Sequence, residues 1–465
     1  MKKWIPVFLF ILFSLSGVSQ KVTVNGTDPG RAQKLVRIII YSDQFSNLEH
    51  TIAETRTNTS GEFFMKFDIV DTKFAYLAVA LEKGEFYLSP GAYYNFNIIL
   101  DTVLSNGSIF DKLPLKFALN AEDGGIYSAI GDFNIEYNEF IYNNIKSIYK
   151  SKDKSVITNF VGEMNKKYAN DTPEYVSNYV RYSLASLLWL SRKEDNVQIL
   201  NNYFINQPVL YNNIQYTDFF KEFFKTYFEN EKIYTYAELI LAINSSEPIE
   251  IIYSILARDE QLALDRRVSE IVGMLLLSRN YYNRDVEKER VISKLKDIQL
   301  YSNYPENQII AKNFIIKLQE LQNGTKAPEF LLLNSDNDTV SMDDFNGKFV
   351  LLSFVKEDCS ICDFHMQLLS DIKKQNEDKF EIVTVVAGND MARLNNFARE
   401  RGYQWPILKT GDNILLLEDY NIRAYPSYIF INPNGTIGYA HLPMPDENME
   451  LYLQRFMDSY NSKKK

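Results

Sequence analysis

The hydrophobic pattern of this 465-residue chain changes twice, and these changes limit the folds available to it. Between residues 21 and 121, short runs of alternating apolar and polar residues, separated by Gly, Asp and Asn, predict a small antiparallel β-sandwich. Between 122 and 322, apolar residues recur at helical spacing, which predicts an all-α region. From 323 to 465, strand and helix patterns alternate, as in an α/β domain with a mixed sheet. They predict strands at 349–355 and 379–388, a hairpin at 427–440, and helices at 390–401 and 446–459. The sequence therefore predicts a multidomain α+β protein.

Residues 1–20 have the features of a secretory signal peptide. Lys2 and Lys3 precede an apolar run over 5–18, and the small residues Gly17 and Ser19 suit a cleavage site. This run is shorter than the ~20 residues that span a bilayer, and no other stretch is long and apolar enough to do so. No cysteine lies near the cleavage region for a lipid anchor. We therefore predict an exported, soluble protein.

The charge balance argues against a nucleic-acid partner. The chain has 60 acidic and 50 basic residues, giving a net charge of −10, and no basic stripe is present to neutralise phosphates.

The helical region contains an aromatic stripe at helical spacing. Such a stripe is either a partner-binding face or part of a core, and the second is far more common. We therefore predict that these residues are buried: Phe219, Phe220, Phe223, Phe224, Tyr227 and Phe228.

Only two cysteines occur, and they form one Cys-x-x-Cys, Cys359 and Cys362. Exported proteins often use cysteines as structural crosslinks, but a bridge that closes so short a loop stabilises a fold weakly. The pair follows an apolar strand predicted at 349–355 and opens a helix predicted to end near Gln375. This placement favours a redox role.

Several motifs in the last third resemble the TlpA-like (ResA-like) branch of exported bacterial thioredoxins. They are GTKAPEF, SMDDFNGKFVLLSF, CSIC, QWPILKT, AYPSYIFINPNG and GYA, in this order between residues 324 and 460. The resemblance implies a thioredoxin-like domain and a periplasmic thiol–disulfide oxidoreductase that acts on protein disulfides or thiols. It also implies a membrane thiol relay as electron donor and no cofactor.

The resemblance assigns roles to four residues. Cys359, at a helix N-terminus where the dipole lowers a thiol pKa, is the expected nucleophile, and Cys362 is the resolving thiol. Pro426 aligns with the cis-proline of the family. A cis bond there would expose the backbone beside Tyr425, so that an extended substrate segment can pair with it as an added strand.

Two acidic residues stand where the family has other residues before the first cysteine. Asp358 replaces a tryptophan and follows Glu357. Carboxylates close to Cys359 would raise the pKa of its thiol and favour a reductant over an oxidant. Alternatively, both carboxylates point into solvent and are screened.

Three further positions depart from the family pattern. Ser353 stands where thioredoxins carry a buried acid, and Gln367 replaces a helix proline. His365 stands where TlpA-like proteins place a glutamate, and on a helix it shares a face with Cys362. We predict either proton exchange between His365 and Cys362 or a surface or packing role for this histidine.

Other functions remain open. Cys359, Cys362 and His365 have the spacing C-x₂-C-x₂-H, which suits copper(I) or zinc, although no fourth ligand is evident. A peroxidase is disfavoured because Leu352 and Lys356 interrupt the Pro-x-x-x-Thr-x-x pattern of peroxiredoxins. A redox-inert binding protein of the cell envelope is a further alternative.

Overall fold

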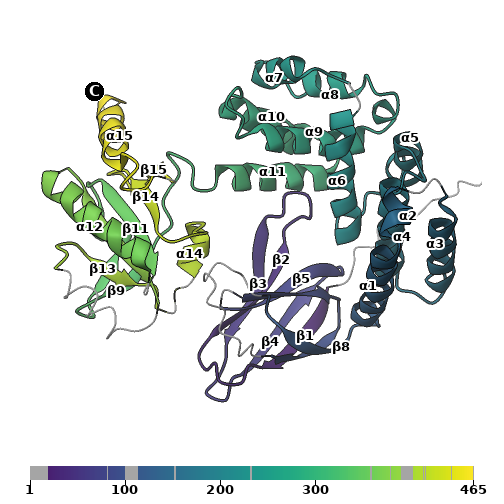
Figure 1. Cartoon of the computed structure of the whole chain (residues 1–465), viewed down its shortest axis with the longest axis horizontal. Helices are drawn as coiled ribbons and strands as arrows, with labels where there is room; N and C mark the ends of the chain where they lie inside the picture. Colours follow the sequence, from purple (N-terminus) through teal and green to yellow (C-terminus); the bar gives the residue numbers. More distant parts are fainter. Residues whose placement is uncertain are drawn as a thin grey trace, which may run out of the picture.

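The computed structural model describes residues 19–463, apart from 81, 100–113, 151–152, 231–232, 357–358, 377–378, 389–401, 412, 414 and 441. Figure 1 shows strands at the bottom, helices at the upper right and a mixed α/β unit on the left. The predicted fold class is therefore confirmed. The predicted signal segment lies almost entirely outside the described residues.

The N-terminal unit is a sandwich of two four-stranded sheets, in the orders β4-β1-β7-β8 and β3-β2-β5-β6. The strands are β1 (Gln20–Thr27), β2 (Leu35–Tyr41), β3 (Glu49–Arg56), β4 (Glu62–Ile69), β5 (Lys73–Val79), β6 (Glu82–Leu88), β7 (Tyr93–Ile98) and β8 (Phe117–Glu122). The sequence pattern did not reveal β1 and β8.

The expectation of a wholly antiparallel sandwich is wrong for one pair of strands. β1 and β7 run parallel, with Val24 opposite Tyr94. Parallel neighbours need a long crossover connection, and here the chain between them makes β2 to β6 before it returns.

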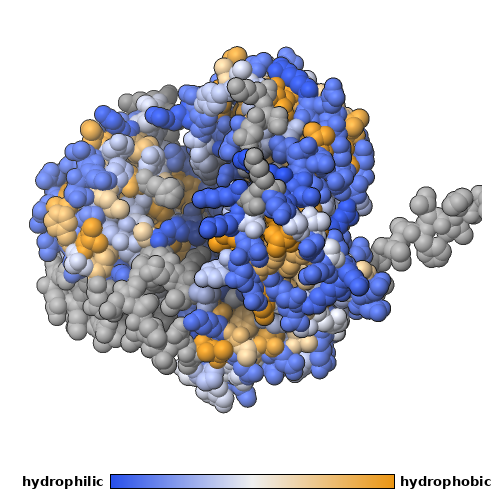
Figure 2. Space-filling model, turned by 45° about the vertical axis from the view of Figure 1, so that its right-hand side comes forward, coloured by the Kyte–Doolittle hydropathy of each residue, from blue (hydrophilic) through white to orange (hydrophobic). Residues whose placement is uncertain are grey.

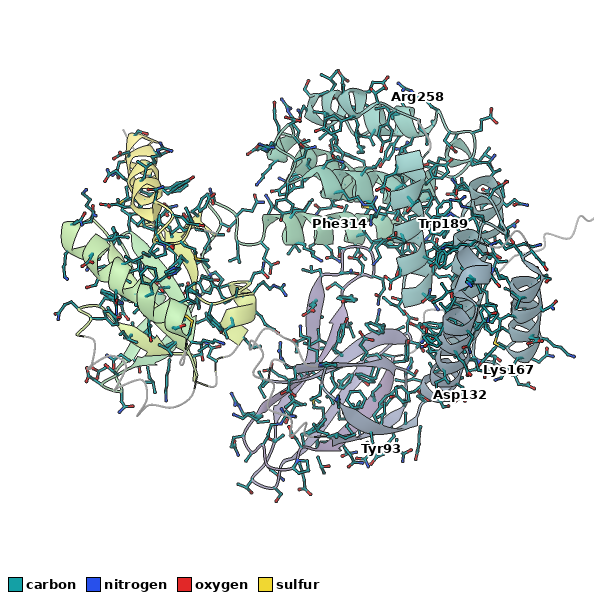
Figure 3. The ribbon with its side chains drawn as sticks, viewed as in Figure 1. Tyr93, Asp132, Lys167, Trp189, Arg258 and Phe314 are labelled. Carbon is teal, nitrogen blue, oxygen red and sulfur yellow. A yellow bond between two sulfur atoms is a disulfide. The ribbon has the colours of Figure 1, made fainter. Side chains whose placement is uncertain are left out.

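The middle region is all α, as predicted. Its helices are α1 (Ile126–Asn143), α2 (Ile145–Tyr149), α3 (Ser155–Lys167), α4 (Glu174–Leu190), α5 (Asn196–Ile199), α6 (Ile214–Asn230), α7 (Tyr236–Asn244), α8 (Glu250–Leu256), α9 (Arg266–Asn280), α10 (Lys288–Tyr301) and α11 (Pro305–Gln319). The aromatic stripe lies on α6, and its residues join the main apolar core, with Phe228 only partly buried. The core prediction is confirmed. Trp189 and Phe314, labelled in Figure 3, belong to the same packed region.

The β2–β3 loop ties the sandwich to the helices. Phe45 is 3% exposed within the helical core, and its ring centroid lies 5.3 Å from that of Phe220. On α11, Lys317 Nζ donates to the carbonyl oxygen of Ser46 at 2.6 Å. The first two units therefore share a core and pack as one body.

The C-terminal unit has a seven-stranded mixed sheet in the order β10-β9-β13-β12-β11-β14-β15. Its elements are β9 (Leu331–Asn334), β10 (Thr339–Ser341), β11 (Val350–Lys356), α12 (Ser360–Gln375), β12 (Glu381–Ala387), β13 (Ile407–Lys409), α14 (Leu415–Asp419), β14 (Ser427–Ile431), β15 (Ile437–Tyr439) and α15 (Met449–Lys463). The strands predicted at 349–355 and 379–388, the helix after CSIC and the hairpin at 427–440 are confirmed. A helix predicted at 390–401 lies outside the described residues.

Among the residues that the structure describes, Glu418 joins the C-terminal unit to the sandwich through two ion pairs. Glu418 on α14 lies 3.0 Å from Arg37 Nη1 and 3.5 Å from Lys83 Nζ. Figure 1 shows α14 on the side of its unit that faces β2 and β3.

The face shown in Figure 2 is mainly hydrophilic, with small separate apolar patches. Within the described ranges, no helix is long and apolar enough to cross a membrane.

Candidate active site

The strand order brings the predicted site residues to one edge of the sheet. β11 and β14 are antiparallel, with Phe354 opposite Ser427, so β14 begins beside the end of β11. Cys359 follows β11 and Pro426 immediately precedes β14. The Tyr425–Pro426 peptide bond is cis, as predicted. Tyr425 packs against the same apolar cluster that contains both cysteines.

Cys359 and Cys362 form a disulfide with a Cα–Cα distance of 5.2 Å. Cys359 is the N-cap residue of α12, and its Sγ accepts a hydrogen bond from the backbone N–H of Cys362 at 3.2 Å. After reduction, the same N–H and the helix dipole would stabilise a negative charge on this sulfur. Cys359 is 8% exposed and Cys362 is fully buried, so Cys359 is the sulfur more open to a partner.

His365 lies on the buried side of α12, one turn after Cys362. It is 2% exposed, and its Nε2 lies 3.4 Å from Asp446 Oδ1. The Asp446 side chain is 49% exposed, so this pair links the buried side of the helix to solvent. Nδ1 of His365 is buried and has no hydrogen-bond partner among the described groups. The surface alternative for His365 is therefore wrong, while a proton-transfer role and a packing role both remain consistent with its position.

Hydroxyl groups line the strands beneath the helix. Ser353 on β11 pairs with Tyr428 on β14, and both side chains are buried. Burial, with a smaller contribution from Asp446, raises the pKa of Tyr428. Among the buried residues of α12, His365 is the one with an imidazole that could take up a proton from Cys362.

Two apolar side chains on α12 are open to solvent beside the disulfide. Ile361 is 52% exposed and Phe364 is 50% exposed. They give the outer side of the cysteine segment an apolar surface. Glu357 and Asp358, on which the predicted direction of electron flow depends, lie outside the described residues.

Sequence reasoning missed Asp446. It lies 81 positions after His365 along the chain and was expected to open the terminal helix, but that helix begins at Met449. No local spacing connects an acid in this loop to a histidine on α12, so only the fold reveals the pair.

The described residues do not complete a metal site around the C-x₂-C-x₂-H motif. Over the part of the chain that the structure describes, no group of three or more His, Cys, Asp or Glu residues is arranged to hold a metal ion.

Comparisons with known proteins bear on the C-terminal third. Residues 323–440 match the model of the AhpC/TSA family. The thioredoxin-like protein YneN of Bacillus subtilis is 31% identical over 136 residues, which are 28% of this chain and 78% of that protein. The thiol-disulfide oxidoreductase ResA of the same organism is 26% identical over 120 residues, covering 26% of this chain and 66% of ResA.

Among solved structures, the exposed lipoprotein thioredoxin Etrx1 of Streptococcus pneumoniae is 27% identical, with a TM-score of 0.24, and covers 28% of this chain and 99% of that one. The sequence identity to YneN over most of its length carries the assignment. Through its C-terminal third, the chain belongs to the thioredoxin-like family that includes the thiol–disulfide oxidoreductases of the ResA type.

Proposed function

We propose that the protein is an exported, periplasmic thiol–disulfide oxidoreductase that reduces disulfides in other proteins with Cys359 and Cys362. One observation carries the proposal: the two cysteines form a disulfide at the start of α12, where Cys359 Sγ receives the N–H of Cys362. Membership of the thioredoxin-like family supports it.

The reaction needs two exchanges. The Cys359 thiolate attacks one sulfur of a substrate disulfide, which forms a mixed disulfide and releases one substrate thiolate. Cys362, as thiolate, then attacks Cys359 Sγ, which forms the Cys359–Cys362 bond and releases the second substrate thiolate. Two electrons pass from the protein dithiol to the substrate. An external dithiol, for which we propose a membrane thiol relay, returns the two electrons, so no cofactor is required.

His365 is proposed to receive the proton that Cys362 must lose before its attack. Both side chains lie on the buried side of α12, where water cannot easily take that proton. Asp446, half exposed beside Nε2, stabilises the protonated imidazole and gives the proton a route to solvent.

Tyr425 and Pro426 are proposed to form the substrate-docking corner. They lie where β14 begins, beside the end of β11 that leads to Cys359. An extended substrate segment would pair with the backbone at this corner and present its disulfide to Cys359.

The reduction potential of the cysteine pair tests the proposal. The full chain would be equilibrated against glutathione buffers, with Cys359→Ser as the control. A value near roughly −270 mV, as in thioredoxin, is expected for a reductant, and a value near roughly −120 mV would indicate an oxidant. If the oxidised pair cannot be reduced and re-formed, and insulin is not reduced, the metal-handling or redox-inert alternative replaces this proposal.

A further inference from the structure

The outer face of the second sandwich sheet carries aromatic residues where such a face usually meets water. Phe74 and Tyr76 lie two residues apart on β5, and Tyr87 lies two residues after Glu85 on β6. The register pairs Tyr76 with Glu85 and Phe74 with Tyr87, so all four side chains share one face. Tyr41, at the end of the neighbouring strand β2, extends this aromatic surface.

The rings hold one another in place. Tyr41 and Tyr76 share a hydrogen bond between their hydroxyl groups at 2.9 Å. The ring centroid of Phe74 lies 5.1 Å from that of Tyr76 and 5.9 Å from that of Tyr87, both edge to face. These contacts favour a preformed surface over one that must be ordered by a ligand.

Residues of helices α4 and α6 line the same space, which makes a cavity that is half open to solvent. Tyr179 of α4 packs against Tyr87 with centroids 6.1 Å apart, and α6 contributes Gln215 and Asp218. The volume of this cavity is about 290 Å³. This volume lies just below the usual range for small-molecule sites, so it suits a single small group.

The charge in the cavity is negative. Asp218 Oδ1 lies 2.9 Å from Lys221 Nζ and is therefore partly neutralised. Glu85 has no ion pair among the residues that the structure describes. Partial desolvation, and then the nearby charge of Asp218, raise the pKa of Glu85, although its side chain remains open to solvent.

We propose that this cavity binds an organic cation, namely an alkylammonium or guanidinium group. The faces of Tyr and Phe rings attract a cation through their quadrupoles, and Glu85 and Asp218 supply opposite charge. A neutral ligand would gain no attraction from these two carboxylates, and an anion would be repelled. The group could belong to a free amine or to a Lys or Arg side chain of a peptide. The inference does not depend on the cysteines.

Calorimetric titration of the full chain with n-butylguanidinium and with its neutral counterpart n-butylurea tests this proposal. Measurable binding of the cation is expected, at least roughly fivefold tighter than binding of the urea. Glu85→Gln should weaken cation binding by a similar factor. Glu54→Gln, which removes an exposed carboxylate on β3 of the same sheet, is the matched control and should bind as the unmodified protein does.

N-acetyl-argininamide distinguishes the two sources of the group. Tighter binding than n-butylguanidinium supports a peptide ligand, and weaker binding supports a free amine. Equal affinity for the guanidinium and the urea overturns the proposal, as does unchanged binding in a Glu85→Gln protein with an unaltered melting curve. Absence of any binding at about 10 mM butylguanidinium also overturns it.

Discussion

The cysteine site and the aromatic cavity are assembled in different ways. Cys359, Cys362 and His365 lie within seven residues on one helix, and a neighbouring strand start supplies the docking corner. The cavity draws on β2, β5, β6, α4 and α6, with residues between 41 and 218. The first site depends on local geometry and the second on the packing of two units. The two sites should therefore respond differently to substitution.

The largest effect is expected from a substitution that removes the chemistry of the cysteine site and leaves cation binding at the cavity intact. Cys359→Ser should abolish insulin reduction, by more than about a hundredfold, because the remaining thiol, Cys362, is fully buried and cannot attack a protein disulfide. Stability should change little, because a disulfide that closes so short a loop stabilises the fold only weakly. Binding of butylguanidinium should be unchanged. Parallel loss of cation binding would show that the two sites are coupled.

Phe204→Ala should lower the stability of the region that carries the cavity and leave that of the cysteine site unchanged. Phe204 is fully buried, and its ring contacts several rings of α6. Truncation of such a side chain typically costs about 3–5 kcal/mol of unfolding free energy. Because the sandwich and helices share a core through Phe45, thermal unfolding should show an earlier transition that removes cation binding.

The disulfide chemistry of Phe204→Ala should persist up to that earlier transition. Phe204→Leu, which keeps most of the buried surface, is the milder control. A single transition that removes both activities together would contradict the distinction between the two sites.

The sequence predicted the cysteine site far better than the cavity. Motif order placed Cys359, Cys362 and Pro426 because a strand, a tight connection and a helix define their positions locally. It could not place Asp446, which reaches His365 only through the fold. Nor could it reveal the cavity, because alternation on β5 and β6 looks the same whether the outer face meets water or helices.

His365→Gln tests whether His365 takes part in the reaction at the cysteine site. If His365 accepts the Cys362 proton, the rate of insulin reduction should fall by about tenfold or more, and its pH dependence between pH 5 and 8 should flatten. Asp446→Asn should have a smaller effect in the same direction. A pH–rate profile that His365→Gln leaves unmoved would reduce this residue to a packing role.

A smaller effect is expected at the contact between Glu418 of the C-terminal unit and the sandwich. Burial alone would raise the pKa of Glu418, but Arg37 and Lys83 outweigh it, and the pKa is lowered below its usual 4.5. This contact therefore stabilises the docked arrangement fully above pH 4.5, and its contribution is lost as the pH falls through the lower folded-state value. We expect this contact to contribute about 1 kcal/mol to the stability of the docked arrangement.

X-ray scattering at pH 7 and at about pH 3.5 would measure this change as an increase in the radius of gyration. Glu418→Gln should be expanded at both pH values and should respond less to acid. An unmodified protein that keeps its radius at low pH would show that other contacts hold the units together.

The Arg37–Glu418 ion pair can hold two units together because both units belong to the same chain. As an encounter between separate molecules, a single ion pair would be too weak to persist. Here α11 is anchored on the β2–β3 loop, and a short stretch leads from Gln319 to β9. The two partners therefore meet at a high effective concentration, of the order of millimolar for a short linker. The fraction of molecules with the thioredoxin-like unit docked should consequently respond to salt and be independent of protein concentration.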